Sequence, residues 1–491
     1  MYIGPGRGSA PGSLVSFLLN ITKVDPIKFN LLFERFLNPK RITMPDIDID
    51  IQSDKRIQVV EYMFNKYGKE NCAQIITFSR IISKSALKDI ARLKGYPVVK
   101  ANLITKKIPN GMGLKESYKK VAKFRAEINK NDENKSLFEM ALLIEGYVRQ
   151  FGTHAAGIVL SNEKLSNIAE ITTSNSGFNQ ISVDGSVIEE IGLLKFDLLA
   201  LSNLTSMIKI IDEIFINYKK KLNIDLINLD DSKTLFLLNS GNTNGIFQVE
   251  SYDMKKTLKD VGIDNFEDLV AVISLYRPGP MAFIPSYIKR KKNEEEIPKI
   301  HPSYDKIVEN TYGIIIYQEQ IMQILQNVSG FDFSEADIMR RAISKKKESL
   351  ILENKDKFIK GALKNNVSEK DANIIFAAIE KFASYGFNRS HAVSYGIISF
   401  SLAYLKSRFP IEFYTAVIGS SSAGQSSLKK YSIEAMAQEI KIISPEINLS
   451  TNVVYNELQN KRIILPFNYI KGLGDSFQKQ LIEVRNNTPF I

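Results

Sequence analysis

The most regular pattern of apolar and polar positions in this chain is the alternation of aspartate and isoleucine over residues 44–51. Successive side chains of a strand point to opposite faces, so the pattern predicts a strand with isoleucines on one face and carboxylates on the other. The carboxylates are Asp46, Asp48 and Asp50. Carboxylates two residues apart on a strand are about 7 Å apart and repel one another unless a cation lies between them. A pair of Mg²⁺ ions, which prefer hard oxygen ligands, would meet that need. A solvated acidic edge strand is the simpler alternative.

Helical and extended patterns surround this strand. Apolar residues at helical spacing predict helices over 25–37 and 53–67, and a strand is expected at 74–78. From residue 81 to 150 the pattern is almost wholly helical and rich in lysine, which we interpret as a helical insertion. Apolar, β-branched runs then return near 157–160 and 180–183, so the chain resumes its strands after the insertion.

The last of these predicted strands covers residues 192–199 and carries a lone carboxylate, Asp197. Lys195 lies two residues earlier, so we expect both side chains on the same face of the strand. Beyond residue 202 the pattern is mostly helical. Four later segments are unusual for plain packing, and they cover residues 275–280, 312–320, 336–342 and 382–392.

A glycine-rich loop at residues 4–13 precedes an apolar run at 14–21. Free backbone N–H groups and the positive end of a helix dipole would suit a phosphate there, and Arg7 adds a fixed charge. The loop is no Walker loop, because no Gly-Lys-Ser/Thr follows. An ordinary flexible turn remains the alternative.

Composition narrows the classes of protein. The 491 residues suggest two to four domains, and 65 Lys+Arg against 54 Asp+Glu give a net charge of +11, which favours a polyanionic partner. The single Cys72 excludes a disulfide framework and a cysteine zinc site and fits a reducing, cytoplasmic setting. We expect no membrane span and no signal peptide. Both ends look cut, so we expect a segment of a longer protein.

Two carboxylates on one strand, a third on another and a basic phosphate loop form the set that two-metal phosphoryl transfer requires. One ion activates a hydroxyl, the other steadies the leaving group, and one carboxylate bridges both ions. Arginines and loop amides would hold a triphosphate in line. The residues alone therefore predict metal-dependent nucleotide chemistry on a polyanionic template.

Eight longer motifs occur along the chain. They are Gly-Pro-Gly-Arg-Gly-Ser at 4–9, Phe-Leu-Asn-Pro at 36–39, Pro-Asp-Ile-Asp at 45–48, Thr-His-Ala-Ala-Gly at 153–157, Lys-Phe-Asp at 195–197, Arg-Pro-Gly-Pro at 277–280, Tyr-Gly-Ile-Ile-Ile-Tyr-Gln-Glu-Gln at 312–320 and Tyr-Gly-Phe-Asn-Arg-Ser-His at 385–391. With these motifs in this order, the chain resembles the α (catalytic) subunits of bacterial DNA polymerase III, the C-family replicative polymerases, over essentially its whole length.

The resemblance implies roles for named residues. Two Mg²⁺ ions, for which Mn²⁺ could substitute, would be held by Asp46, Asp48 and Asp197, with Lys195 beside them. Asp50 would at best support these ligands without touching the ions. The nucleotide would be contacted by Arg7, Gly8, Ser9, Arg340, Arg341, Tyr385, Asn388 and His391. Tyr385 would stack on the base, Asn388 and His391 would lie along sugar and phosphates, and the two arginines would reach the triphosphate.

The resemblance also implies a multidomain α/β (α+β) fold. A nucleotidyltransferase-type palm with a mixed sheet would cover 1–77 and 153–202, a helical thumb 78–152, and large, mostly helical fingers 203–440. Residues 441–491 would begin the helix-hairpin-helix DNA-binding region. The implied partners are primer-template DNA and dNTPs. The sliding clamp, clamp loader and proofreading exonuclease would bind mainly outside this chain.

Some residues depart from the family pattern. Pro11 stands where a smaller, more flexible residue is expected in the loop, and residues 199–202 replace an expected Gly and Arg. By the same resemblance, we expect the family's N-terminal polymerase-and-histidinol-phosphatase domain and its C-terminal OB-fold to lie outside this chain. Two alternatives stay open: another palm-type nucleotidyltransferase, and a non-catalytic DNA-binding fragment.

Overall fold

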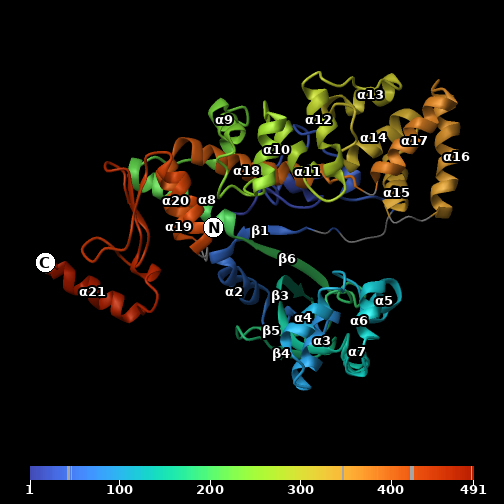
Figure 1. Ribbon diagram of the computed structural model, residues 1–491. Coiled ribbons are helices and arrows are strands. Elements are labelled where there is room, and N and C mark those ends of the chain that lie inside the picture. Colours follow the sequence, from blue (N-terminus) through green and yellow to red (C-terminus); the bar gives the residue numbers. More distant parts are fainter. Residues whose placement is uncertain are drawn as a thin grey trace. The chain divides into compact units, whose positions relative to one another are not determined.

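A computed structural model describes residues 1–40, 45, 47–344, 348–383, 385–420, 425–487 and 489–490. The chain forms two compact units. Unit 1 comprises residues 1–57 and 198–491, and unit 2 comprises residues 58–197 (Figure 1). Both helices and a mixed set of strands are present, so the expected α/β class is confirmed. Among the described residues, no helix is both long and apolar enough to cross a membrane.

The acidic strand is shorter than the hydropathy pattern predicts. Strand β1 covers Ile49–Gln52 and pairs in parallel with the second half of β6 (Leu194–Leu201), with Ile49 opposite Leu198. Pro45 lacks the N–H that a ladder needs, and Asp46 lies outside the described residues. Asp50 is 1% exposed, as is Ile51, so both faces of β1 are buried and the solvated-edge alternative is wrong.

The helix expected over 25–37 is also wrong. The side chain of Asp25 accepts from the backbone N–H groups of Ile27 and Lys28, which turns the chain locally. Asn30 then adopts a left-handed conformation, with φ of 49°, and only a 3₁₀ turn at Phe33–Arg35 follows. Local hydrogen bonds from a side chain to the nearby backbone therefore turn the chain, although the spacing of its apolar residues favours a helix.

Unit 1 is built mainly of helices, as expected beyond residue 202. Its helices are α1 (Leu14–Leu18), α8 (Ser202–Tyr218), α9 (Ser232–Ser240), α10 (Tyr252–Val261), α11 (Phe266–Leu275), α12 (Ile284–Lys291), α13 (Pro302–Val308), α14 (Gln318–Ser329), α15 (Phe333–Ser344), α16 (Glu348–Lys364), α17 (Glu369–Ala383), α18 (Arg389–Arg408), α19 (Pro410–Gly419), α20 (Gln425–Met436) and α21 (Asp475–Asn487). A small sheet in the order β7-β9-β8 (Lys441–Ile443, Arg462–Ile464, Tyr455–Glu457) was not expected from the sequence.

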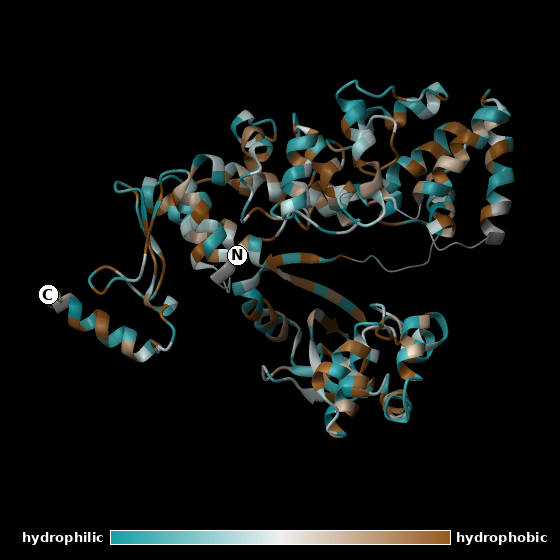
Figure 2. Ribbon diagram, viewed as in Figure 1, coloured by the Kyte–Doolittle hydropathy of each residue, from teal (hydrophilic) through white to brown (hydrophobic). Residues whose placement is uncertain are grey.

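Helix α18 is the centre of the main core of unit 1. Nearly all of its residues between Ser390 and Lys406 are buried, because it is covered by other helices on several sides. It lies beside α11, where Phe400 meets Phe266 at 6.0 Å between ring centroids, and hydrophobic residues gather at this contact (Figures 1 and 2). A second core is formed by α13 to α17.

Unit 2 combines a mixed sheet with the expected helical insertion. The strands β2 (Cys72–Arg80), β3 (Val148–Leu160), β4 (Ile171–Thr173), β5 (Asn179–Ile181) and the first half of β6 lie in the order β6-β3-β2-β5-β4. The inserted helices are α3 (Ser83–Leu93), α4 (Val98–Thr105), α5 (Leu114–Lys120), α6 (Ala122–Ile128) and α7 (Asp132–Ile144), with a core of their own. Helix α2 (Arg56–Tyr67), expected over 53–67, connects the two units along the chain.

Candidate active site

The glycine-rich loop lies directly against β1 in unit 1. The backbone N–H of Gly4 donates to the carbonyl of Asp50 at 2.8 Å, and a Cβ on Gly4 would lie only 3.0 Å from the Cβ of Asp50. Gly6 has φ of 144°, and a Cβ there would come within 2.5 Å of Pro11. Glycine is therefore needed at both positions for the loop to fold back onto the acidic strand.

Arg7 of this loop meets the carboxylates of the strand. Its Nε lies 3.8 Å from Asp48 Oδ2 and its Nη1 lies 3.5 Å from Asp50 Oδ1. The Asp50 side chain is fully buried, its Oδ2 has no hydrogen-bond partner, and burial raises its pKa to about 6 although Arg7 opposes the rise. The residues alone predict a basic loop near the aspartates, and the structure brings Arg7, Asp48 and Asp50 together.

His391 holds the next residue of the loop. The backbone N–H of Gly8, whose φ is 61°, donates to Nδ1 of His391 at 3.0 Å. Burial, helped by the charge of Arg7, lowers the pKa of His391 to about 4, so the imidazole is neutral at pH 7 and carries its proton on Nε2. The Gly8 amide is thus engaged by His391 rather than left open for a phosphate. Ser9 accepts from Gly12 through its carbonyl.

Tyr385, Asn388 and His391 recur at three-residue spacing, which would place them on one face of a helix if the whole segment were helical, but it is not. Helix α18 begins only at Arg389, because Asn388 is its N-cap and accepts from the backbone N–H groups of Ser390 and His391 at 3.1 and 3.4 Å. Tyr385 precedes the helix in a turn and is 44% exposed. Asn388 therefore fixes the start of the helix that carries His391.

Tyr385 is held from the rigid turn at residues 277–280. Arg277 donates to its backbone carbonyl. A Cβ on Gly279, whose φ is 99°, would lie 2.5 Å from the ring of Tyr385, so the glycine leaves room for the ring. An exposed aromatic ring braced in this way is suited to stacking.

Asp197 and Lys195 pair in unit 2, as their spacing predicts. Lys195 Nζ lies 2.9 Å from Asp197 Oδ2, while Asp197 Oδ1 is buried without a hydrogen-bond partner. Gly157 faces Asp197 across the antiparallel ladder, and a Cβ there would come within 3.3 Å of Oδ1. The side chain of His154 accepts from the N–H of Gly157 at 2.6 Å.

Arg340 and Arg341 form an ion-pair cluster on α15 of unit 1. Arg340 is 4% exposed and donates to Asp337 Oδ1 at 3.1 and 2.7 Å. Arg341 lies 3.1 Å from Asp337 Oδ2, and its side chain is 38% exposed. Of the two guanidinium groups, that of Arg341 is the more accessible to a ligand.

The sequence predicts a metal site at the acidic strand. No group of three or more His, Cys, Asp or Glu side chains among them is arranged to hold a metal ion, and Asp46 lies outside that part of the chain. Asp50 in unit 1 and Asp197 in unit 2 each have a buried carboxylate oxygen without a hydrogen-bond partner. Each of these oxygens fits a cation, because such atoms are rare in native proteins unless something satisfies them. Hard oxygen donors suit Mg²⁺.

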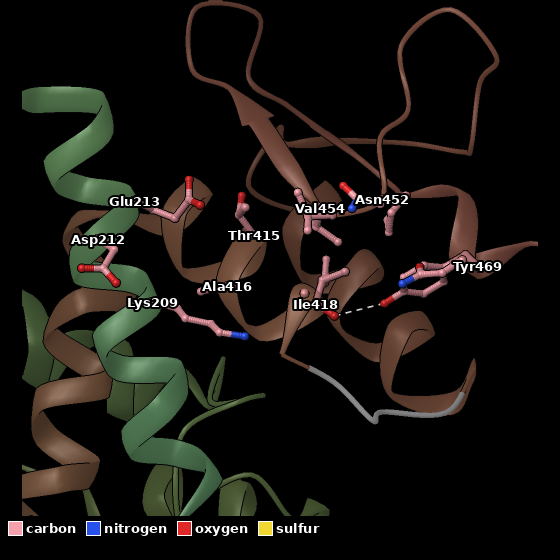
Figure 3. Close-up of a pocket in the computed structure, with 13 residues that line it drawn as sticks. Lys209, Asp212, Glu213, Thr415, Ala416, Ile418, Asn452, Val454 and Tyr469 are labelled. Atoms are coloured by element: carbon pink, nitrogen blue, oxygen red, sulfur yellow. Dashed lines mark hydrogen bonds between the residues drawn. The ribbon is translucent and has the colours of Figure 1, made fainter. Parts of the chain in front are cut away.

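A cavity of about 850 Å³ in unit 1 lies elsewhere (Figure 3). Its lining includes Lys209, Asp212 and Glu213 of α8 together with residues of α19 and of the segments 452–454 and 466–469. Tyr469 donates from its hydroxyl to the carbonyl of Ile418 at 3.0 Å at its edge. None of the residues expected to act from the sequence lines this cavity.

Two family models cover most of the chain. The model described as "Bacterial DNA polymerase III alpha NTPase domain" matches residues 1–200, and that described as "Bacterial DNA polymerase III alpha subunit finger domain" matches residues 203–366. The chain belongs to the family of bacterial DNA polymerase III α subunits.

Individual relatives agree with the family models. The chain is 43% identical over 498 residues to DNA polymerase III subunit alpha of Staphylococcus epidermidis (strain ATCC 12228), covering 100% of this chain and 46% of the relative. For the Staphylococcus aureus (strain Mu50) protein the identity is 42% over 492 residues, covering 99% and 45%. For Bacillus subtilis (strain 168) it is 41% over 489 residues, covering 99% and 44%. This DNA polymerase III α-type chain thus spans about half the length of these curated relatives.

One site residue was missed by sequence reasoning on this polymerase family member. Tyr395 accepts a hydrogen bond from Nη1 of Arg7 through its hydroxyl, and its ring packs on that of His391 at 4.1 Å between centroids. The four-residue spacing between His391 and Tyr395 could have identified it. Residues four apart share a helix face, so Tyr395 follows from His391 once the helix is known to begin at Arg389.

Proposed function

We propose that this chain catalyses template-directed DNA synthesis, adding dNMP from a dNTP to a primer 3′-hydroxyl with release of pyrophosphate. The observation that carries the proposal is the meeting of Arg7 with Asp48 and Asp50, where the glycine-rich loop lies on β1. A fixed guanidinium beside carboxylates is what nucleotidyl transfer needs to accept a triphosphate next to metal ligands. Relatives that carry the name DNA polymerase III subunit alpha support it, and this chain spans 44–46% of their length.

Asp46, Asp48 and Asp197 would hold two Mg²⁺ ions, with Mn²⁺ as a possible substitute. When bound, the ions would acidify the primer hydroxyl and neutralise charge on the phosphates. Asp48 directly precedes β1 in unit 1, and Asp197 lies in β6 at the end of unit 2. Lys195, paired with Asp197 at 2.9 Å, would orient that carboxylate.

The remaining residues would bind and orient the nucleotide. Arg7 and Ser9 would contact the triphosphate from the loop, while Gly8, whose amide donates to His391, would hold the loop in place. Arg340 and Arg341 would contact the triphosphate from the fingers. Tyr385 would stack on the base. Asn388 would set the start of α18 and His391 would approach the sugar, for which its neutral imidazole retains the Nε2–H as a donor.

The same proposal covers architecture and partners. Residues 1–77 and 153–202 would act as palm, 78–152 as thumb and 203–440 as fingers, with 441–491 leading into a helix-hairpin-helix region. The chain would act in the cytoplasm on primer-template DNA. The sliding clamp, clamp loader and proofreading exonuclease would be partners of the longer protein.

A primer-extension assay tests the proposal. With Mg²⁺ and four dNTPs, the chain should extend a labelled primer and copy the template sequence. Extension without regard to the template, or with rNTPs as readily as dNTPs, would instead assign another palm-type nucleotidyltransferase. Binding of primer-template with no extension at any metal concentration would leave a non-catalytic DNA-binding role.

A further inference from the structure

The first two turns of α18 hold two consecutive residues of the glycine-rich loop. His391 accepts the N–H of Gly8, and Tyr395, one turn further along, accepts from Arg7. Residues four apart lie on the same helix face, and the two rings touch, with centroids 4.1 Å apart. Ser394 lies on that face too, since a Cβ on Gly6 would come within 3.4 Å of its Oγ. One face of α18 therefore shapes the loop.

Among the described residues, Arg7 contacts Asp48, Asp50 and Tyr395, and of these Tyr395 is the neutral partner. The contacts to Asp48 and Asp50, at 3.8 and 3.5 Å, are at or beyond the length of a good hydrogen bond. The hydroxyl of Tyr395 makes a hydrogen bond with Nη1, and the guanidinium also lies 5.7 Å from the centroid of its ring. The arginine side chain keeps 31% exposure, so part of it stays open to a ligand.

Tyr395 is itself firmly held. It is 6% exposed, and the ring of Phe247 meets it edge-on at 4.9 Å between centroids. The carbonyl of Phe247 accepts from the hydroxyl of Ser399, which lies one turn further along α18. Packing on both sides leaves the hydroxyl of Tyr395 little freedom, so it is a rigid anchor for a flexible arginine.

We propose that Tyr395 is a positioning residue that fixes the guanidinium of Arg7 for the triphosphate of the incoming nucleotide; the inference rests on the proposed function. A carboxylate anchor alone would neutralise Arg7 and compete with phosphate for it. A neutral hydroxyl fixes the guanidinium without neutralising its positive charge, which stays available to the triphosphate. Losing the hydroxyl frees Arg7 to pair fully with Asp48 or Asp50, and the triphosphate then loses a preorganised contact.

The test is single-turnover incorporation of one dNTP by Tyr395→Phe, which removes only the hydroxyl. We expect the apparent Kd for dNTP to rise about tenfold, the usual effect of one hydrogen bond to a charged group, while the maximal rate changes less than about threefold. Tyr469→Phe, which also loses one hydroxyl hydrogen bond but at the cavity in Figure 3, is the matched control and should leave the Kd unchanged. A Kd unchanged in Tyr395→Phe, or raised equally in both variants, overturns the inference.

A double-mutant cycle with Arg7→Ala separates positioning from general damage. If Tyr395 acts through Arg7, Tyr395→Phe should have no further effect on the dNTP Kd in the Arg7→Ala background. Equal effects in both backgrounds would show that Tyr395 acts by another route and would overturn the inference. Wild-type protein without incorporation, or Arg7→Ala with full incorporation, would instead contradict the proposed function itself.

Discussion

The contact between Gly8 and His391 predicts an unusual titration. The pKa of His391 is lowered from 6.5 to about 4, mainly by burial and further by Arg7. Above pH 6.5 the imidazole is neutral in the folded and unfolded states, so it contributes nothing to the pH dependence of stability. Between pH 6.5 and 4 the unfolded chain binds a proton that the folded chain does not, and the free energy of unfolding falls as the pH falls.

The size of the effect follows from the two pKa values. The full difference between 6.5 and about 4 is worth about 3 kcal/mol, and about 2 kcal/mol of it is lost between pH 7 and 5. Urea unfolding at both pH values should therefore show that the wild type loses about 2 kcal/mol more than His391→Gln, whose side chain does not titrate. The comparison cancels the titration of all the carboxylates that the two proteins share.

Histidine-selective NMR measures the protonation state of His391, and thus tests its contact with Gly8 directly. The chain has only three histidines, His154, His301 and His391, so ¹⁵N-histidine labelling gives three ring systems, and His391→Gln assigns one of them. We expect that ring to carry its proton on Nε2, to keep Nδ1 as an acceptor and to stay neutral down to about pH 4. A ring that titrates near pH 6.5, or one protonated on Nδ1 at pH 7, would refute the contact.

Further changes should have separable effects. Asp197→Asn should cut kcat for incorporation at least tenfold while primer-template binding stays within a few-fold, because a metal ligand acts on the transition state; Asp50→Asn should do markedly less, and both are read by single-nucleotide kinetics. His391→Ala should raise the relative kcat/KM for rNTP over dNTP about tenfold, and an unchanged ratio would leave His391 as a holder of the loop alone. Lys406→Met should destabilise unit 1 by about 3 kcal/mol in urea unfolding, since it leaves Glu434 buried without its ion pair, and Glu434→Gln in the same chain should recover part of that loss. Duplex DNA binding should weaken steeply with salt and show no sequence preference, as measured by titration at several ionic strengths.

Periodicity predicted the larger elements well, because their burial follows simple rules. The helical insertion at 81–150 and the strand around Asp197 both formed where the apolar spacing indicated them. The helix expected at 25–37 failed because the side chain of Asp25 and the left-handed Asn30 turn the chain locally, and apolar spacing does not register such bonds. The small sheet at 441–464 has three-residue strands, too short for alternation to be distinguished from chance.

The candidate site was only partly predictable, because it depends on contacts distant in sequence. Arg7 and Tyr395 are 388 positions apart, and no local pattern links them. The spacing of Tyr385, Asn388 and His391 suggested one helix face, but the cap at Asn388 places the helix start after the first two. Charge alternation correctly marked the acidic strand, yet it did not predict that Asp50 would be buried beside a loop arginine.

The most direct test of the central claim compares a carboxylate of the site with an exposed carboxylate on helix α7. Incorporation of a single labelled dNTP opposite its complementary template base, with Mg²⁺, should be rapid for the wild type. It should fall by at least a hundredfold, or about 2.7 kcal/mol, for Asp48→Asn. Asp132→Asn, whose side chain is 99% exposed, should match the wild type. Equal activity of Asp48→Asn and Asp132→Asn, or incorporation that ignores the template base, would contradict template-directed synthesis at this site.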